Sequence, residues 1–175
     1  MRYVYPGRYG RERAKMEQLE PGVRRVRANN PSPMTFTGTN TYLLVTRHIA
    51  VIDPGPDDPE HLEAILSAVP ERARISHILV THSHLDHSPL ARALSGRTGA
   101  PVYAMGDSRA GRSPIMEELA GSGLMRGGEG VDPDFRPDEV LSLGMRMDSP
   151  DWQIEAIHTP GHFGNHMSFA VQDIV

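Results

Sequence analysis

The chain has 175 residues, which is enough for one domain with a hydrophobic core of its own. It contains no cysteine, so disulfides and thiolate metal ligands are excluded, and any metal ion must be held by histidine, aspartate or glutamate. There is no apolar run of membrane-spanning length and no apolar signal segment after Met1. The composition therefore predicts a cytoplasmic globular protein that does not act at a membrane.

Charge is distributed unevenly along the chain, whose net charge is −4. Residues 1–28 contain eight Lys or Arg against three Glu, a net charge of +5, whereas the remainder is acidic. We expect residues 1–22 to form a basic N-terminal arm. Such an arm could contact RNA or another acidic ligand, or it could be a solvated terminus or a contact with a second copy in a homo-oligomer.

The sequence after residue 22 predicts alternating strands and helices. Strands are expected at residues 23–28, 39–45, 49–53, 75–80 and 101–104, from their β-branched and apolar side chains. The second and third of these are joined by a short connection at Arg47 and His48, which predicts an antiparallel hairpin. The last four of these strands and two intervening helices follow the order ββαβαβ, which indicates a layered α/β fold.

Two helices are marked by their ends. Asp58 is a capping residue, Pro59 fits the first helical position, and Pro70 ends the first helix. Its apolar positions recur at helical spacing, as Leu62, Ile65, Leu66 and Val69. The second helix is expected to begin at Ser88 and Pro89, continue through Leu94 and stop at Gly96.

Residues 105–137 differ from the rest of the chain. They are rich in Gly, Pro, Arg and acidic residues, with one short helical patch at residues 115–120. Long loops in compact domains are usually functional or mobile, so we interpret this segment as a surface flap or insertion. Further strands are expected at residues 140–143, 152–158 and 167–175.

Three histidines and an aspartate occur within six positions, directly after the buried strand at residues 75–80. The segment is Thr-His-Ser-His-Leu-Asp-His, residues 81–87. Ligands of open α/β sheets bind at the carboxyl ends of strands, and residues two apart in an extended segment point to the same side. His82 and His84 can therefore hold one ion, while Asp86 and His87 can face a second. Imidazole and carboxylate ligands suit zinc, and also iron or manganese.

A third imidazole follows a later strand. His162 lies after the Pro-Gly turn of the segment His-Thr-Pro-Gly-His, residues 158–162. Three histidines with one open position form a catalytic zinc geometry, so His162 is the candidate that completes the set begun by His82 and His84.

These motifs resemble the metallo-β-lactamase superfamily. The pattern His-x-His-x-Asp-His is followed by Thr-Pro-Gly-His, and Val-Ile-Asp-Pro-Gly at residues 51–55 is similar to an early motif of that family. The resemblance is closest to hydroxyacylglutathione hydrolases (glyoxalase II) and related β-lactamase-like hydrolases. It implies that residues 23–175 form the family's αββα sandwich, with only the N-terminal half and the start of the second half present.

The resemblance also implies roles for individual residues. His82, His84 and His162 would bind the first metal, and Asp86 and His87 the second, with Asp86 also orienting the nucleophile. Asp53 would orient a ligand histidine through a hydrogen bond, and His166 would be a structural histidine behind the site. The family's bridging Asp and final His would lie beyond Val175, since Asp173 falls inside the last expected strand, so we expect a chain truncated at its C-terminus.

The activity implied is metal-dependent hydrolysis by a zinc-activated hydroxide, with two zinc ions in the complete protein. The motifs favour a small acyl thioester or related ester as substrate. RNA phosphodiesters are the alternative that the basic arm favours. A β-lactam is less expected because nothing in the sequence indicates secretion. A redox di-metal protein or a binding protein of the same fold remains a further alternative.

Overall fold

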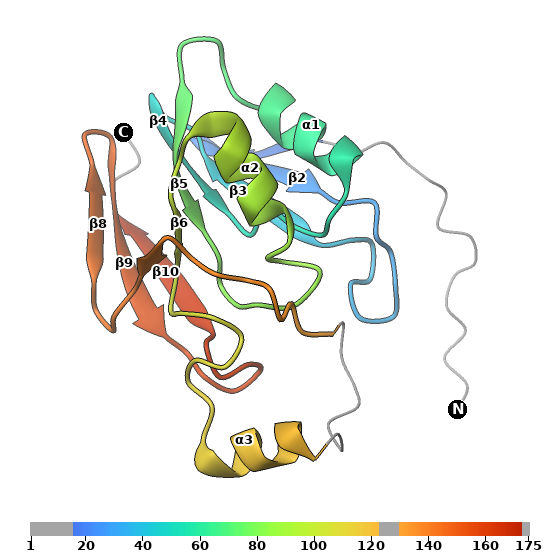
Figure 1. Cartoon of the computed structure of the whole chain (residues 1–175). Coiled ribbons are helices and arrows are strands. Elements are labelled where there is room, and N and C mark those ends of the chain that lie inside the picture. The colour runs from blue at the N-terminus through green and yellow to red at the C-terminus, as the bar shows by residue number, and fades with distance from the viewer. Residues whose placement is uncertain (1–15, 123–129, 173–175) are drawn as a thin grey trace.

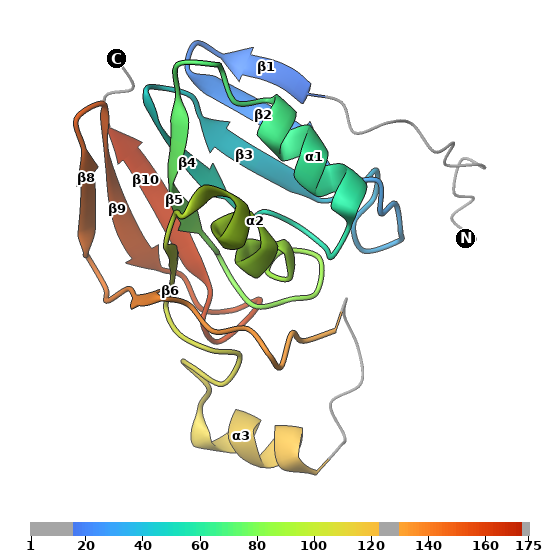
Figure 2. The same ribbon diagram turned by 45° about the horizontal axis from the view of Figure 1, so that its top comes forward.

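The computed structural model describes residues 16–122 and 130–172 (Figure 1). Asp173 and most of the expected basic arm, residues 1–15, lie outside the described residues. Two β-sheets face each other, and two helices cover the outer face of the larger sheet (Figures 1 and 2). The described part of the chain thus supplies three successive layers, helix, sheet and sheet, of the expected sandwich.

The larger sheet has seven strands in sequence order. They are β1 (Met16–Glu20), β2 (Val23–Arg27), β3 (Asn40–Leu44), β4 (His48–Ile52), β5 (Arg74–Leu79), β6 (Val102–Ala104) and β7 (Glu139–Val140). β1 to β4 are antiparallel neighbours, which confirms the predicted β3–β4 hairpin, and β4 to β7 are parallel neighbours. The parallel strands bring the ends of β4 and β5 to one edge of the sheet.

The smaller sheet is antiparallel, in the order β10-β9-β8. Its strands are β8 (Arg146–Ser149), β9 (Trp152–His158) and β10 (Met167–Gln172). The core between the two sheets contains Leu79, Trp152, Ile154 and Met167, all nearly inaccessible to solvent. The packing of the two sheets against each other holds the loop between β9 and β10 beside the end of β5.

A second core lies between the larger sheet and helices α1 (Pro59–Ser67) and α2 (Leu90–Thr98). The predicted start of α1 is confirmed, because the Asp58 side chain accepts a hydrogen bond from the Glu60 N–H at 2.9 Å and Pro59 occupies the first turn. Its apolar stripe includes the buried residue Ile65.

The structure corrects the predicted end of α2 and the strands after residue 137. α2 continues through Gly96 to Thr98 and ends at Gly99, whose φ of 74° gives the left-handed cap. A glycine inside a helix is tolerated at a cost of about 1 kcal/mol, so Gly96 alone does not end it. In place of the strand expected at residues 140–143, the structure has the two-residue strand β7 (Glu139–Val140). The sequence did not predict β8, because its residues, Arg-Met-Asp-Ser, have little strand propensity.

The end of the expected basic arm belongs to the sheet. Residues 16–20 form β1, an exposed edge strand in which Met16 lies opposite Val26 of β2. A salt bridge between Glu17 and Arg25 also joins the two strands.

The expected flap contains helix α3 (Pro114–Gly121), which is capped by the Ser113 side chain and has no buried residue. Figures 1 and 2 show α3 standing apart from the sheets. The end of the segment is packed differently, because Phe135 is buried in the core beside α2. No helix of the described residues is long and apolar enough to cross a membrane.

Candidate metal centre

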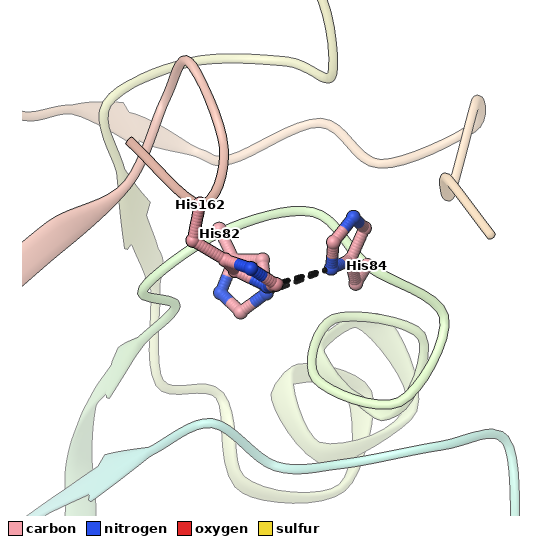
Figure 3. A group of neighbouring side chains, drawn as sticks. All are labelled: His82, His84 and His162. Atoms are coloured by element: carbon pink, nitrogen blue, oxygen red, sulfur yellow. Dashed lines mark hydrogen bonds between the residues drawn. The ribbon is translucent and has the colours of Figure 1, made fainter. Parts of the chain in front are cut away.

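Three imidazoles converge at the carboxyl end of β5 (Figure 3). His82 and His84 follow β5 in the chain, and His162 comes from the loop between β9 and β10. His84 Nδ1 lies 3.1 Å from His82 Nε2 and 3.2 Å from His162 Nε2. The structure therefore brings together three of the residues that the sequence singled out, from segments almost 80 positions apart.

The spacing of these nitrogens fits a metal ion. Two nitrogens bound to tetrahedral zinc, each at 2.0–2.1 Å, are roughly 3.3 Å apart, and the two closest separations here are 3.1 and 3.2 Å. Hydrogen bonds alone account poorly for the arrangement, because His84 Nδ1 carries at most one proton and can donate it to only one of its two neighbours. His162 is exposed, so the group opens towards solvent.

Asp53 and Thr81 set which nitrogen of His82 is free. Asp53 Oδ1 accepts from the Thr81 N–H at 2.7 Å, and Oδ2 accepts from the Thr81 hydroxyl at 2.8 Å. The hydroxyl has one hydrogen, so at its 2.9 Å contact with His82 Nδ1 it must accept. His82 Nε2 then presents a lone pair to the other two imidazoles. The sequence showed Thr81 beside the motif but gave no indication of this role.

Asp86 and His87 lie next to this group and form a second pair of possible metal ligands. His87 Nε2 is 3.2 Å from Asp86 Oδ2, and its Nδ1 is 2.9 Å from Asp53 Oδ2. Thr39 also donates its hydroxyl hydrogen to Asp86 Oδ2, at 2.9 Å. Asp86 Oδ1 is buried and has no protein partner. A buried carboxylate oxygen without a donor fits a cation or water ligand at this place.

Charge at the site is arranged to favour a cation near the carboxylates. Burial opposes the charged form of His87, but hydrogen bonds to Asp53 and Asp86 outweigh it and raise the pKa of His87 to about 10. Burial likewise opposes ionisation of Asp86, yet the hydrogen bonds from His87 and Thr39 lower its pKa to about 2. Burial, reinforced by neighbouring imidazoles, lowers the pKa of His82. His82 is therefore neutral, as a metal ligand must be.

The local fold places Asp53 for these contacts. It follows β4, its N–H donates to the Leu79 carbonyl at 2.9 Å, and its φ of 52° turns the chain into Pro54 and Gly55. Aspartate is one of the few non-glycine residues that adopts this conformation readily. Asp53 is buried, so its carboxylate is directed to Thr81 and His87 rather than to solvent.

His61, which matched no motif, supports this turn from α1. It is fully buried, its Nε2 lies 2.8 Å from the Thr41 hydroxyl, and that hydroxyl donates to the Asp53 carbonyl at 2.7 Å. A side chain on Gly55 would lie 2.9 Å from the His61 ring, so the turn and the ring pack directly together.

Burial lowers the pKa of His61 from 6.5 to about 4, which predicts acid sensitivity of the fold. Between these pH values the unfolded chain binds a proton that the folded chain does not, so stability falls as pH drops from about 6.5 to 4. The shift corresponds to about 3 kcal/mol. Urea unfolding of the metal-free protein against pH should show a shallower loss in His61→Gln than in the wild type. An equal loss of stability with falling pH in the two proteins would contradict the lowered pKa of His61.

His166 lies behind the three imidazoles. Its ring centroid is 5.1 Å from that of His82, and its Nδ1 is 2.9 Å from the Thr159 hydroxyl. The structural role expected of His166 stays a prediction. Of the remaining histidines, His48 and His77 lie near Asp151 and Trp152, on strands β4 and β5 rather than in the ligand loops.

The family model of the metallo-beta-lactamase superfamily matches residues 34–173. The chain belongs to the metallo-beta-lactamase superfamily. Among curated relatives, the atrochrysone carboxyl ACP thioesterase of Aspergillus terreus is 30% identical over 163 residues, covering 90% of this chain and 42% of the relative. The beta-lactamase-like protein 2 homolog of Caenorhabditis elegans is 27% identical over 165 residues, covering 90% and 48%. The chain spans less than half the length of these relatives.

Solved structures show the same fold at lower identity. A metallo-beta-lactamase of Cronobacter sakazakii is 24% identical with a TM-score of 0.64, covering 91% of this chain and 60% of that one. BJP-1, a subclass B3 metallo-beta-lactamase of Bradyrhizobium japonicum, is 21% identical with a TM-score of 0.62, covering 89% and 56%. These likenesses confirm the predicted superfamily fold.

Proposed function

We propose that the chain forms the metal-binding part of a zinc-dependent hydrolase that acts on an acyl thioester or a related ester. The observation that carries the proposal is the convergence of His82, His84 and His162, whose ligand atoms all lie within 4.8 Å of one another. Membership of the superfamily adds support. The same kinds of ligand also bind iron or manganese, so the identity of the metal as zinc is part of the proposal.

In this proposal the three imidazoles hold one ion, and Asp86 with His87 contributes to a second. A bound zinc ion would supply Lewis acidity, lowering the pKa of a water molecule to about 7 and polarising the carbonyl oxygen of the substrate. Asp86 would orient the attacking water through Oδ1, which has no protein partner. Asp53 would hold His87 by the 2.9 Å hydrogen bond to Nδ1, and Nε2, which lies 3.2 Å from Asp86 Oδ2, would give up its proton to bind the ion.

Apolar side chains beside His84 favour an organic acyl substrate. The Phe163 ring lies 4.7 Å from the His84 ring, and the neighbouring residues Leu85 and Val131 are exposed although apolar. The backbone N–H of Leu85 donates to the Gly130 carbonyl, and His84 pairs with Val131, so Leu85 and Val131 lie on the two backbone segments that meet at His84. An acyl group would bury this surface favourably, whereas a phosphodiester backbone would gain more from cations. The thioesterase name of the relative from Aspergillus terreus points in the same direction.

The substrate proposal is tested by comparing an acyl thioester with a single-stranded RNA oligonucleotide, using the zinc-loaded full-length protein at low and moderate salt. We expect thioester cleavage to be faster, to depend little on salt, and to stop when a chelator removes the metal. Faster RNA cleavage that weakens with salt and with deletion of residues 1–15 would reverse the choice of substrate.

A further inference from the structure

The side chain of Asn165 connects the two loops that carry the three imidazoles. Asn165 follows His162 by three residues and is 1% exposed. Its Nδ2 donates to the Ser83 hydroxyl at 3.1 Å, and Ser83 is fully buried between His82 and His84 in the chain. One amide thus joins the loop of His162 to the loop that holds the other two imidazoles.

The same amide group reaches a third segment. Asn165 Nδ2 also donates to the backbone carbonyl of Asp107, at 2.8 Å, near the start of the flap segment 105–137. A carbonyl can only accept, so the orientation of the amide is fixed by this contact. Both hydrogens of the amide nitrogen then have partners, in two different loops.

Close backbone packing accompanies this contact. A Cβ atom on Gly111 would lie 2.1 Å from the Gly164 carbonyl oxygen, and one on Gly164 would lie 2.9 Å from the Gly111 carbonyl carbon. The root of the flap segment therefore packs directly against the residue next to Asn165, and the φ of 72° at Gly111 favours glycine there.

Asn165 has an energetic cost that a packing role alone would not require. Its Oδ1 is buried and has no hydrogen-bond partner among the described residues. An unsatisfied buried acceptor destabilises a fold, and an apolar side chain of similar size would avoid the loss. What the amide gains in return is the pair of directed hydrogen bonds to Ser83 and Asp107, and these define the spacing between the loops.

We propose that Asn165 is a positioning residue that fixes His162 relative to His82 and His84 and so preorganises the metal site. The inference rests on the proposed metal-dependent function, because the spacing matters only if the imidazoles share an ion. Residues that orient metal ligands from behind typically change metal affinity by 10–100-fold when they are replaced. Ser83 is the partner through which Asn165 acts on His82 and His84.

The test is a zinc titration of the full-length protein against a chromophoric chelator, with thermal unfolding of the metal-free form measured in parallel. We expect Asn165→Ala to lower zinc affinity about tenfold or more, and Ser83→Ala to lower it less, because the contact with Asp107 remains. The double variant should bind zinc no more weakly than Asn165→Ala, since the hydrogen bond between Asn165 and Ser83 is already lost in that single variant. Thr98→Ala, which removes a side-chain hydrogen bond to Leu94 in α2, is the matched control and should leave zinc affinity unchanged.

The outcomes separate this inference from the proposed function. Wild-type protein that binds no zinc would overturn both. Wild-type zinc binding with equal affinity in Asn165→Ala would overturn the positioning role alone, even if the metal-free variant melts at a lower temperature. If Asn165→Ala does not fold, unchanged zinc affinity in Ser83→Ala overturns the inference, and a several-fold loss supports it.

Discussion

Replacing His84 with alanine should lower zinc affinity by more than about a hundredfold and remove detectable hydrolysis. His84 Nδ1 lies between the other two imidazole nitrogens, at 3.1 and 3.2 Å, so it is the common member of the group. Even residues that only orient a metal ligand cost 10–100-fold in affinity when they are replaced, and a direct ligand should cost more. Zinc affinity and turnover of the variant measure the effect.

The matched control is His48→Ala. His48 lies at the opposite end of β4 from Asp53, and its Nδ1 contacts Asp151 at 3.0 Å. Loss of that contact should not change zinc affinity, although it removes one histidine just as the His84 variant does. Equal zinc affinity in His84→Ala and the wild type would show that the metal, if bound, is held elsewhere.

Replacing Asp53 with alanine should destabilise the fold strongly as well as weaken metal binding. The carboxylate accepts from the Thr81 N–H, the Thr81 hydroxyl and His87 Nδ1, and all three donors would lose their acceptor. Breaking a buried charged pair costs about 3–5 kcal/mol. Alanine is also less suited than aspartate to the φ of 52° at this position. Urea unfolding of the metal-free protein measures the loss.

Asp53→Asn separates the charge of this residue from its shape. Asparagine tolerates the same backbone conformation, and one oxygen can still accept from the Thr81 N–H. The amide nitrogen would then face the Thr81 hydroxyl and His87, which removes the acceptor that fixes their proton positions. We expect stability between those of the wild type and Asp53→Ala, with zinc affinity reduced.

Asp151→Ala is the comparison for these two variants. Asp151 is also paired with a histidine, but its side chain is more exposed than that of Asp53, so its loss should destabilise far less. Equal stability of Asp53→Ala and Asp151→Ala would contradict the role assigned to Asp53.

The elements that sequence predicted well are those whose signals are local. Asp58 and Pro59 define the start of α1 within two residues, and residues 81–87 place His82 and His84 directly after a buried strand. His162 could be added because its Pro-Gly turn follows another strand. Local sequence patterns therefore predicted the group of three imidazoles and most of the larger sheet.

The remaining features depend on contacts between distant segments. β8 forms because it pairs with β9, not because its own residues favour a strand. The lone pair of His82 is set through Thr81 by Asp53, 28 positions earlier, and Asn165 reaches Ser83 across 82 positions. The packing of the flap segment also depends on a distant contact. The Asp132 N–H donates to the Ser83 carbonyl and attaches the end of the segment to the loop that carries His82 and His84. No short-range pattern contains such information.

X-ray absorption at the zinc edge, combined with metal analysis, tests most directly whether His82, His84 and His162 share an ion. The protein should be purified without chelator and loaded with zinc. We expect at least one zinc per chain, bound by imidazole nitrogens at about 2.0–2.1 Å, and fewer of these nitrogens in His84→Ala. A wild-type protein that retains no zinc, or zinc whose imidazole signal is the same in His84→Ala, would contradict it.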